Sequence, residues 1–369
     1  MQAGDEGQPR RTSQRGQHGQ QIALSAAGAG PLETSSYGMI RRDTLITPNP
    51  KLKILDQMRE VMRLKHYSIR TEASYCDWVR RYIKFHNMRS REELQPAEEK
   101  MELFLSDLAG RGRVAASTQN QAFNALLFLY REILHQQLGQ VKALRADRPV
   151  RVPVVLTADE VREVIGAMAG LTQLVAKILY GSGLRLMEAL RLRVQDVDFG
   201  MKQVTVRDGK GSKDRFTVLP ESVIPALQAH LRGVRRLHQR DLGMGAGAVF
   251  LPGALDRKYP NAAREWKWQY VFPARDLSKD PRSGIVRRHH LDETTMHRAI
   301  KAGVAKVGIA KNVGSHTFRH SFATHALQRG ADIRTIQELL GHNDVSTTMI
   351  YTHVLRQGGA GMKSPLDYL

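Results

Sequence analysis

The sequence is short of cysteine. It holds a single residue of this type, Cys76, so no disulfide can form within the chain. A metal site built from several cysteine ligands is excluded for the same reason. Such sparse use of cysteine is typical of a reducing compartment, and we expect a cytoplasmic protein.

Long apolar runs are missing as well. No stretch approaches the ~20 consecutive apolar residues that a membrane-spanning helix needs. The mildly apolar stretch 22–32 consists mostly of Ala and Gly, which makes a poor core for a secretory signal. The sequence therefore predicts no membrane span.

Acidic residues are scarce relative to basic ones. The 36 Asp and Glu stand against 56 Lys and Arg, which gives a formal net charge of +20. Residues 1–48 hold five Arg, no Lys and four acids, so nearly all of the excess lies in residues 49–369. A basic folded body indicates a polyanionic partner, with nucleic acid as the first candidate and an acidic membrane surface as the second. Charge alone also fits a protein that is merely basic.

Apolar periodicity divides the first part of the chain. Residues 1–48 show no sustained period and few large apolar groups, which predicts a disordered extension. Residues 49–148 have helical spacing, and one predicted helix face holds Tyr75, Trp78, Val79, Tyr82 and Ile83. A later helix is expected to take its N-cap from Ser117 or Thr118, because both types cap helices well.

A linker and a mixed domain follow. Residues 145–153 are charged and include two prolines, which is typical of an interdomain linker. Thr157 and Glu160 have the spacing of a capping box, so a helix is expected to begin there.

The mixed domain is expected to contain a small sheet. Residues 204–206 and 216–219 are predicted strands, joined by a polar segment at 208–214. The helical pattern returns from Leu291 onward.

Five short segments of this domain carry groups suited to phosphate chemistry. They contribute Arg185 from Gly-Ser-Gly-Leu-Arg, a glycine-flanked Lys210, His316 and Arg319 from His-Thr-Phe-Arg-His, His342 from Leu-Leu-Gly-His, and Tyr351 nine residues later. His316 and Arg319 are three residues apart and therefore neighbours on a helix face. Gly341 is expected to be a helix C-cap, so that His342 projects from a helix end.

These residue types fit phosphodiester exchange. Its transition state gathers negative charge on the nonbridging oxygens, which two guanidiniums can bind in bidentate fashion. A tyrosine can act as the nucleophile, but its ordinary pKa near ~10 calls for a base or a cationic pocket.

Together the segments closely resemble the tyrosine recombinase (phage integrase) family. The resemblance implies a mainly α fold with a small antiparallel sheet, arranged as a two-domain C-shaped DNA clamp. A helical, SAM-like core-binding domain would span 49–148, and a catalytic domain 149–356, before a tail at 357–369. Arg185 and Arg319 would hold the phosphate, and Tyr351 would form a covalent 3′-phosphotyrosine.

The resemblance also implies that Lys210 protonates the leaving 5′ oxygen, while His316 and His342 handle protons or bond the phosphate. The covalent bond conserves the phosphodiester energy, so neither a metal nor another cofactor is expected. DNA is the implied partner, bound by a homotetramer on synapsed sites.

Several alternatives stay open. His316 and His320 have the spacing of a zinc-binding pair, although no Glu of the His-Glu-x-x-His type follows His316. Tyr180 and Tyr368 are rival tyrosines. A type IB topoisomerase shares the nucleophile, and a non-catalytic architectural DNA-binding protein would share the charge.

An insert at about 253–290 resembles that of integron integrases. Ala262, Trp266 and Tyr270 are spaced to share one face of an additional helix, with Trp268 elsewhere. Such an enzyme would recombine gene cassettes on folded single-stranded and duplex sites, and the aromatic rings would stack on an unpaired base. The expected DNA contacts are Arg264, Trp266, Lys267, Trp268, His289, His290 and, outside the insert, His320.

Two other interpretations of the insert remain. Its aromatic rings can equally pack the insert onto the body. The enzyme can also be a phage- or chromosome-dimer-type recombinase that acts on ordinary duplex sites.

Overall fold

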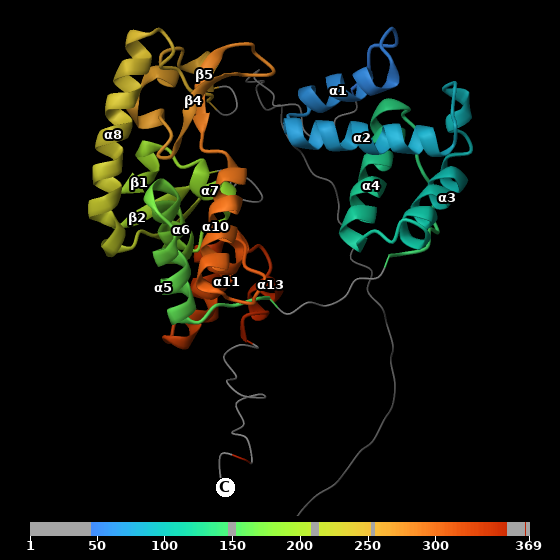
Figure 1. Ribbon diagram of the computed structural model, residues 1–369. Helices are drawn as coiled ribbons and strands as arrows, with labels where there is room; N and C mark the ends of the chain where they lie inside the picture. Colours follow the sequence, from blue (N-terminus) through green and yellow to red (C-terminus); the bar gives the residue numbers. More distant parts are fainter. Residues whose placement is uncertain (1–45, 147–152, 208–213, 252–254, 353–365, 367–369) are drawn as a thin grey trace, which may run out of the picture. The chain divides into compact units, whose positions relative to one another are not determined.

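The computed structural model describes residues 46–146, 153–207, 214–251, 255–352 and 366 (Figure 1). The chain divides into two compact units, Met1–Pro149 and Val150–Leu369. None of the helices within the described ranges is long and apolar enough to cross a membrane.

The regular elements in the described part of unit 1 are all helical. Its core is formed by apolar faces of the helices, with Met58, Val79, Tyr82 and Leu126 fully buried. The helix predicted around Tyr82 is confirmed. Its elements are α1 (Ile54–Leu64), α2 (Ile69–Phe85), a 3-10 turn (Glu92–Leu94), α3 (Ala97–Gly110), α4 (Ala116–Phe128) and a π-helical turn (Leu129–Ile133).

The predicted N-cap of α4 is wrong. The helix begins at Ala116, its N-cap is Ala115 in an extended conformation, and Ser117 and Thr118 lie inside its first turn. The carbonyl of Ala115 already accepts a hydrogen bond from the N–H of Thr118 at 2.8 Å, so helical bonding starts before either hydroxyl residue can cap it.

Unit 2 combines helices with two small antiparallel sheets. Its helices are α5 (Ala158–Ala167), α6 (Gly170–Ser182), α7 (Leu186–Leu190), α8 (Ile224–Gly243), α9 (Leu255–Lys258), α10 (Glu293–Val307), α11 (Ser315–Gln328), α12 (Ile333–Leu340) and α13 (Ser346–Met349). Its strands are β1 (Val197–Asp198), β2 (Gln203–Val206), β3 (Arg215–Val218), β4 (Pro273–Lys279) and β5 (Val286–His290), and its 3-10 turns are Val194–Asp196, Glu221–Val223, Ala262–Arg264 and Trp266–Trp268.

Local signals for unit 2 are confirmed. The Thr157 side chain accepts from the Glu160 N–H at 3.1 Å, and the Glu160 carboxylate accepts from the Thr157 N–H at 2.7 Å, which completes the capping box that opens α5. The two predicted strands are β2 and β3, which pair in the sheet order β1-β2-β3 with Val204 opposite Thr217. The helical pattern after Leu291 corresponds to α10 through α13.

The predicted helix of the insert is wrong. Two 3-10 turns replace it, separated by Glu265, whose ψ of 144° is extended. The Gln269 side-chain amide donates to the carbonyls of Ala263 and Glu265, and Arg193 donates to the carbonyl of Trp268. Side chains thus satisfy backbone acceptors that a continuous helix would have to use itself.

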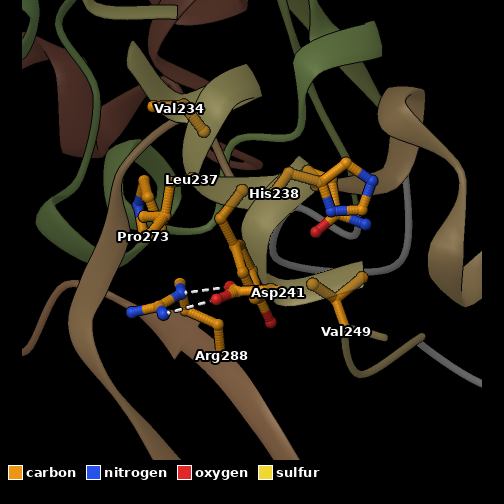
Figure 2. A pocket seen from close by; sticks show the side chains of 9 residues that line it. Val234, Leu237, His238, Asp241, Val249, Pro273 and Arg288 are labelled. Atoms are coloured by element: carbon orange, nitrogen blue, oxygen red, sulfur yellow. Dashed lines mark hydrogen bonds and ion pairs between the residues drawn. The ribbon is translucent and has the colours of Figure 1, made fainter. Parts of the chain in front are cut away.

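The hairpin of β4 and β5, which the sequence did not predict, completes the insert. Arg288 of β5 donates from Nε and Nη2 to the two carboxylate oxygens of Asp241 on α8, at 2.6 and 2.8 Å (Figure 2). The two side chains are 11% and 4% exposed, so this is a mostly buried bidentate ion pair. It fixes the hairpin against the end of α8, where Figure 1 also shows the two elements together.

Candidate active site

Arg319 lies at the centre of the site that the sequence motifs indicated. It is carried by α11 and is 2% exposed. Nη1 donates to the carbonyl of Gly183 at 2.7 Å, and Nη2 donates to the carbonyl of Leu340 at 2.5 Å. Burial, and then the charge of Arg185, lowers the pKa of Arg319 to about 10, so the group stays cationic at neutral pH. One guanidinium therefore connects the segments that end α6 and α12.

Two glycines make these carbonyls available. Gly183 ends α6 and Gly341 ends α12, both in the left-handed conformation, with φ of 63° and 64°. A Cβ on Gly183 would lie 2.5 Å from the Phe322 ring, and one on Gly341 would lie 2.7 Å from Cδ of Arg215. The C-cap predicted at Gly341 is confirmed, and it places His342 directly after the helix end.

Arg185 presents the more accessible guanidinium. It precedes α7, its side chain is 29% exposed, and Nη1 donates to Glu188 Oε1 at 2.7 Å. Glu188 also accepts the backbone N–H of Arg185 at 2.8 Å. Burial alone would raise the pKa of Glu188, but hydrogen bonds and charge from Arg215 and Arg185 outweigh it and lower that pKa to about 2. The carboxylate is therefore ionised and orients Arg185.

His342 is held in one tautomer. Its Nε2 lies 3.0 Å from Arg319 Nη2, and because a guanidinium can only donate, Nε2 is the acceptor. Its Nδ1, 2.9 Å from Thr348 Oγ1, then carries the proton of the neutral ring. Burial, with the charges of Arg319 and Arg185, lowers the pKa of His342 to about 4.

Tyr351 lies against two histidines and is 2% exposed. Its hydroxyl is 2.9 Å from Nδ1 of His320, and its ring stacks on His342 with centroids 6.3 Å apart. Burial raises the pKa of the Tyr351 hydroxyl, against the opposing charges of Arg319 and Arg185. The phenol is thus protonated at neutral pH, and His320 is the side chain that bonds it.

His316 and His320 share one side of α11. Their ring centroids are 6.3 Å apart, and burial, followed by the charges of Arg319 and Arg185, lowers the pKa of His316. Within the described ranges, no group of three or more His, Cys, Asp or Glu side chains is arranged to hold a metal ion. Among the described residues, His316 and His320 therefore have no third side chain placed to complete a zinc site.

The remaining tyrosines and the lysine are placed differently. Lys210 and Tyr368 lie outside the described residues. The Tyr180 hydroxyl lies 2.9 Å from Nδ1 of His325.

Arg215 also takes part in this site, although the sequence motifs did not indicate it. Its guanidinium donates to both carboxylate oxygens of Glu188, at 3.1 and 2.7 Å, and its Nε donates to the carbonyl of Leu339 at 3.0 Å. The only local signal is a basic residue at the start of a strand, a pattern that surface strands share. Glu188 carried a weak signal, since it follows Arg185 at the spacing of a capping box.

The insert residues form a separate group. Trp266 and Trp268 are partly buried against the body and keep part of their surface exposed, while Arg264 and Lys267 are exposed. His289 stacks on Tyr270 with centroids 5.5 Å apart, and His290 contacts the same ring edge-on. Burial is the main cause that lowers the pKa of His290 to about 4. His320, by contrast, belongs to the group around Tyr351.

Comparison with known proteins identifies this arrangement. The family model described as "Phage integrase family" matches residues 154–357, and "Phage integrase, N-terminal SAM-like domain" matches residues 54–140. An "Integrase/recombinase" from Escherichia coli is 50% identical over 325 residues, which cover 88% of this chain and 96% of that protein. "Tyrosine recombinase XerD" from Mycobacterium tuberculosis is 32% identical over 317 residues, 79% of this chain and 90% of that protein.

Solved structures agree in fold. The Tn1549 transposon integrase in complex with transposon right end DNA matches with a TM-score of 0.54 and 14% identity, over 86% of this chain and 96% of that one. The XerH site-specific recombinase bound to its difH substrate matches with a TM-score of 0.50 and 20% identity, over 82% of each chain.

Fold and relatives together define a DNA-binding enzyme that recombines DNA at specific sites. The chain belongs to the phage integrase family and is a tyrosine recombinase. The architectural protein considered from the sequence is thereby set aside.

Proposed function

We propose that Tyr351 is the nucleophile of this recombinase and that Arg185, Arg319, His316, His342 and Lys210 complete its catalytic set. One observation carries the proposal: five of these six side chains come from distant segments and converge around Arg319 and Tyr351. Lys210, outside the described residues, enters through the resemblance alone.

The proposed step is a transesterification. The Tyr351 oxygen bonds to phosphorus while the bond from phosphorus to the 5′ oxygen breaks, leaving a 3′-phosphotyrosine. Tyr351 loses its proton and the 5′ oxygen gains one, with Lys210 as the proposed donor. Neutral His320 lies against the phenol and is the proposed acceptor of its proton.

The two arginines suit the negative charge that develops on the phosphate. Arg185 and Arg319 would bind the nonbridging oxygens as their negative charge grows. Arg319 is fixed by two carbonyls, so it needs little reorganisation when the phosphate arrives. His342 and His316 add polar groups beside the same phosphate. Both units of the chain are proposed to bind the DNA. Four copies of the chain are proposed to assemble as a homotetramer on synapsed sites.

For the substrate, we infer integron-type recombination of gene cassettes. The support is the insert, whose aromatic and basic side chains are partly open on the surface of unit 2. Arg193 holds the insert: its guanidinium lies 3.7 Å from the Tyr270 ring centroid and donates to the carbonyls of Trp268 and Phe250 at 2.9 and 2.8 Å. A platform fixed in this way can stack an unpaired base without becoming ordered first.

The decisive experiment compares two substrates. Purified protein is given a cassette site either as a folded single strand with unpaired bases or as a fully paired duplex of the same sequence. The proposal expects recombination of the folded strand with a duplex partner site to be faster. Equal or better recombination between two duplex sites would indicate a phage- or chromosome-dimer-type enzyme instead, and the nucleophile assignment would be unaffected.

A further inference from the structure

Arg215 occupies the junction of three segments that the sequence motifs treat separately. It stands at the start of β3, its side chain is 10% exposed, and it binds Glu188 of α7 through Nη1 and Nη2, the two terminal guanidinium nitrogens. Its Nε donates to the carbonyl of Leu339, two residues before Gly341. Gly341 leaves it room, since a Cβ there would lie 2.7 Å from Cδ of Arg215.

The charges around Glu188 explain what this contact does. Its carboxylate lies 2.7 Å from Arg185, 2.7 Å from Arg215 and 3.9 Å from Arg319. A carboxylate paired with Arg185 alone would cancel the positive charge that the phosphate needs. Arg215 supplies a second cation and a bidentate partner, so the cluster keeps an excess of positive charge for an anionic ligand.

We propose that Arg215 is a positioning residue: it holds the Glu188 carboxylate, so that Glu188 binds Arg185 through one guanidinium nitrogen and leaves the other donors of Arg185 to the scissile phosphate. Through Leu339 it also fixes the end of α12, from which His342 projects. All three guanidinium nitrogens of Arg215, Nε included, donate to Glu188 or to the carbonyl of Leu339. The inference rests on the proposed role of Arg185 in phosphate binding.

The first test is the single-turnover rate of covalent adduct formation on a nicked duplex site, at saturating protein. Arg215→Ala should slow this step by about 10²-fold, comparable to the loss of one preorganised transition-state donor. Arg215→Lys retains the charge but cannot make the bidentate contact, so its rate should lie between those of Arg215→Ala and the wild type. The matched control is Lys311→Ala, which breaks another ion pair of unit 2, between Lys311 and Glu160 at 2.5 Å, and should leave this rate unchanged.

Two further measurements separate positioning from a structural role. Adding Glu188→Gln to Arg215→Ala removes the carboxylate charge that would capture Arg185, so the double variant should recover about tenfold in rate over Arg215→Ala. A site with a methylphosphonate at the scissile position gathers less negative charge, so the defect of Arg215→Ala should shrink on it. A variant that is merely misfolded would be slow on both substrates, and a second lesion would make it slower.

Three outcomes would contradict the positioning role of Arg215. Equal defects on phosphate and methylphosphonate, a double variant slower than Arg215→Ala, or a near-normal rate of Arg215→Ala would each overturn the inference. If Arg215→Ala does not fold, Arg215→Lys is measured on the same two substrates and decides by the same criterion. The rate of adduct formation is also measured for Arg185→Ala. A normal rate for that variant would instead overturn the proposed phosphate-binding role of Arg185.

Discussion

The hydroxyl of Tyr351 lies 2.9 Å from Nδ1 of His320, one helical turn beyond His316 on α11. Both side chains are largely buried, and burial favours the neutral form of each: the pKa of Tyr351 is raised and that of His320 is lowered to about 4. A neutral imidazole can take the phenol proton as the oxygen attacks phosphorus. His320, which directly follows Arg319 in the chain, is thus in contact with the proposed nucleophile Tyr351.

Replacing Tyr351 with Phe should abolish the covalent adduct and leave DNA binding intact, because the change removes one oxygen and no charge. Adduct trapping and gel shift on the same preparation measure both. Persistent adduct would mean that another tyrosine, Tyr180 or Tyr368, is the nucleophile.

Replacing His320 with Gln should slow adduct formation by about 10²-fold, since an amide can hydrogen-bond the phenol but cannot accept its proton. Single-turnover rates at saturating protein provide the measurement, with His66→Asn in unit 1, an exposed histidine, as the control. A rate within about threefold of the wild type would argue against proton transfer to His320.

The two arginines should differ in stability although both are needed for cleavage. Arg319→Ala leaves the carbonyls of Gly183 and Leu340 without their buried donors, which should lower the free energy of unfolding by about 1–3 kcal/mol. Arg185 is partly exposed, so the free energy of unfolding of Arg185→Ala should be close to that of the wild type. Denaturant titration of both variants checks this, and the opposite ranking would contradict the assignment of Arg319 as the buried anchor.

Acid should destabilise unit 2 in a defined pH window. The pKa values of His320 and His342 are lowered to about 4 in the folded state, below the ordinary value of ~6.5. The unfolded chain therefore binds more protons between these values, and stability that is complete above pH ~6.5 is lost as the pH falls toward 4. The melting temperature should drop over that range, and His320→Gln should flatten the drop. An identical slope in the variant would exclude His320 as a contributor.

The tryptophans test the substrate proposal. If Trp266 or Trp268 stacks on an unpaired base, its change to Ala should weaken binding of a bulged hairpin by ~1–3 kcal/mol, or about 5- to 150-fold, and leave paired duplex binding nearly normal. Packing alone would lower the melting temperature and affect both DNAs alike. An unchanged ratio of the two affinities in folded variants of both residues would remove the stacking hypothesis.

The sequence by itself determined the local features of this protein. The capping box of Thr157 and Glu160, the C-cap at Gly341 and the strands β2 and β3 depend on residues close in the chain, where spacing and side-chain type decide the conformation. The motif residues were singled out through their resemblance to the tyrosine recombinase set, and their catalytic roles are the proposal made above.

Only the tertiary structure decided the contacts between distant segments. Arg319 meets a carbonyl 136 residues away at Gly183, Arg215 meets Glu188 across 27 residues, and His320 meets Tyr351 across 31. Periodicity shows that a face is buried but not what it is buried against. In the insert the same limit produced an error: Ala262, Trp266 and Tyr270 have helical spacing, yet hydrogen bonds from Gln269 and Arg193 take the carbonyls that a helix would need, so long-range partners overrode the local pattern.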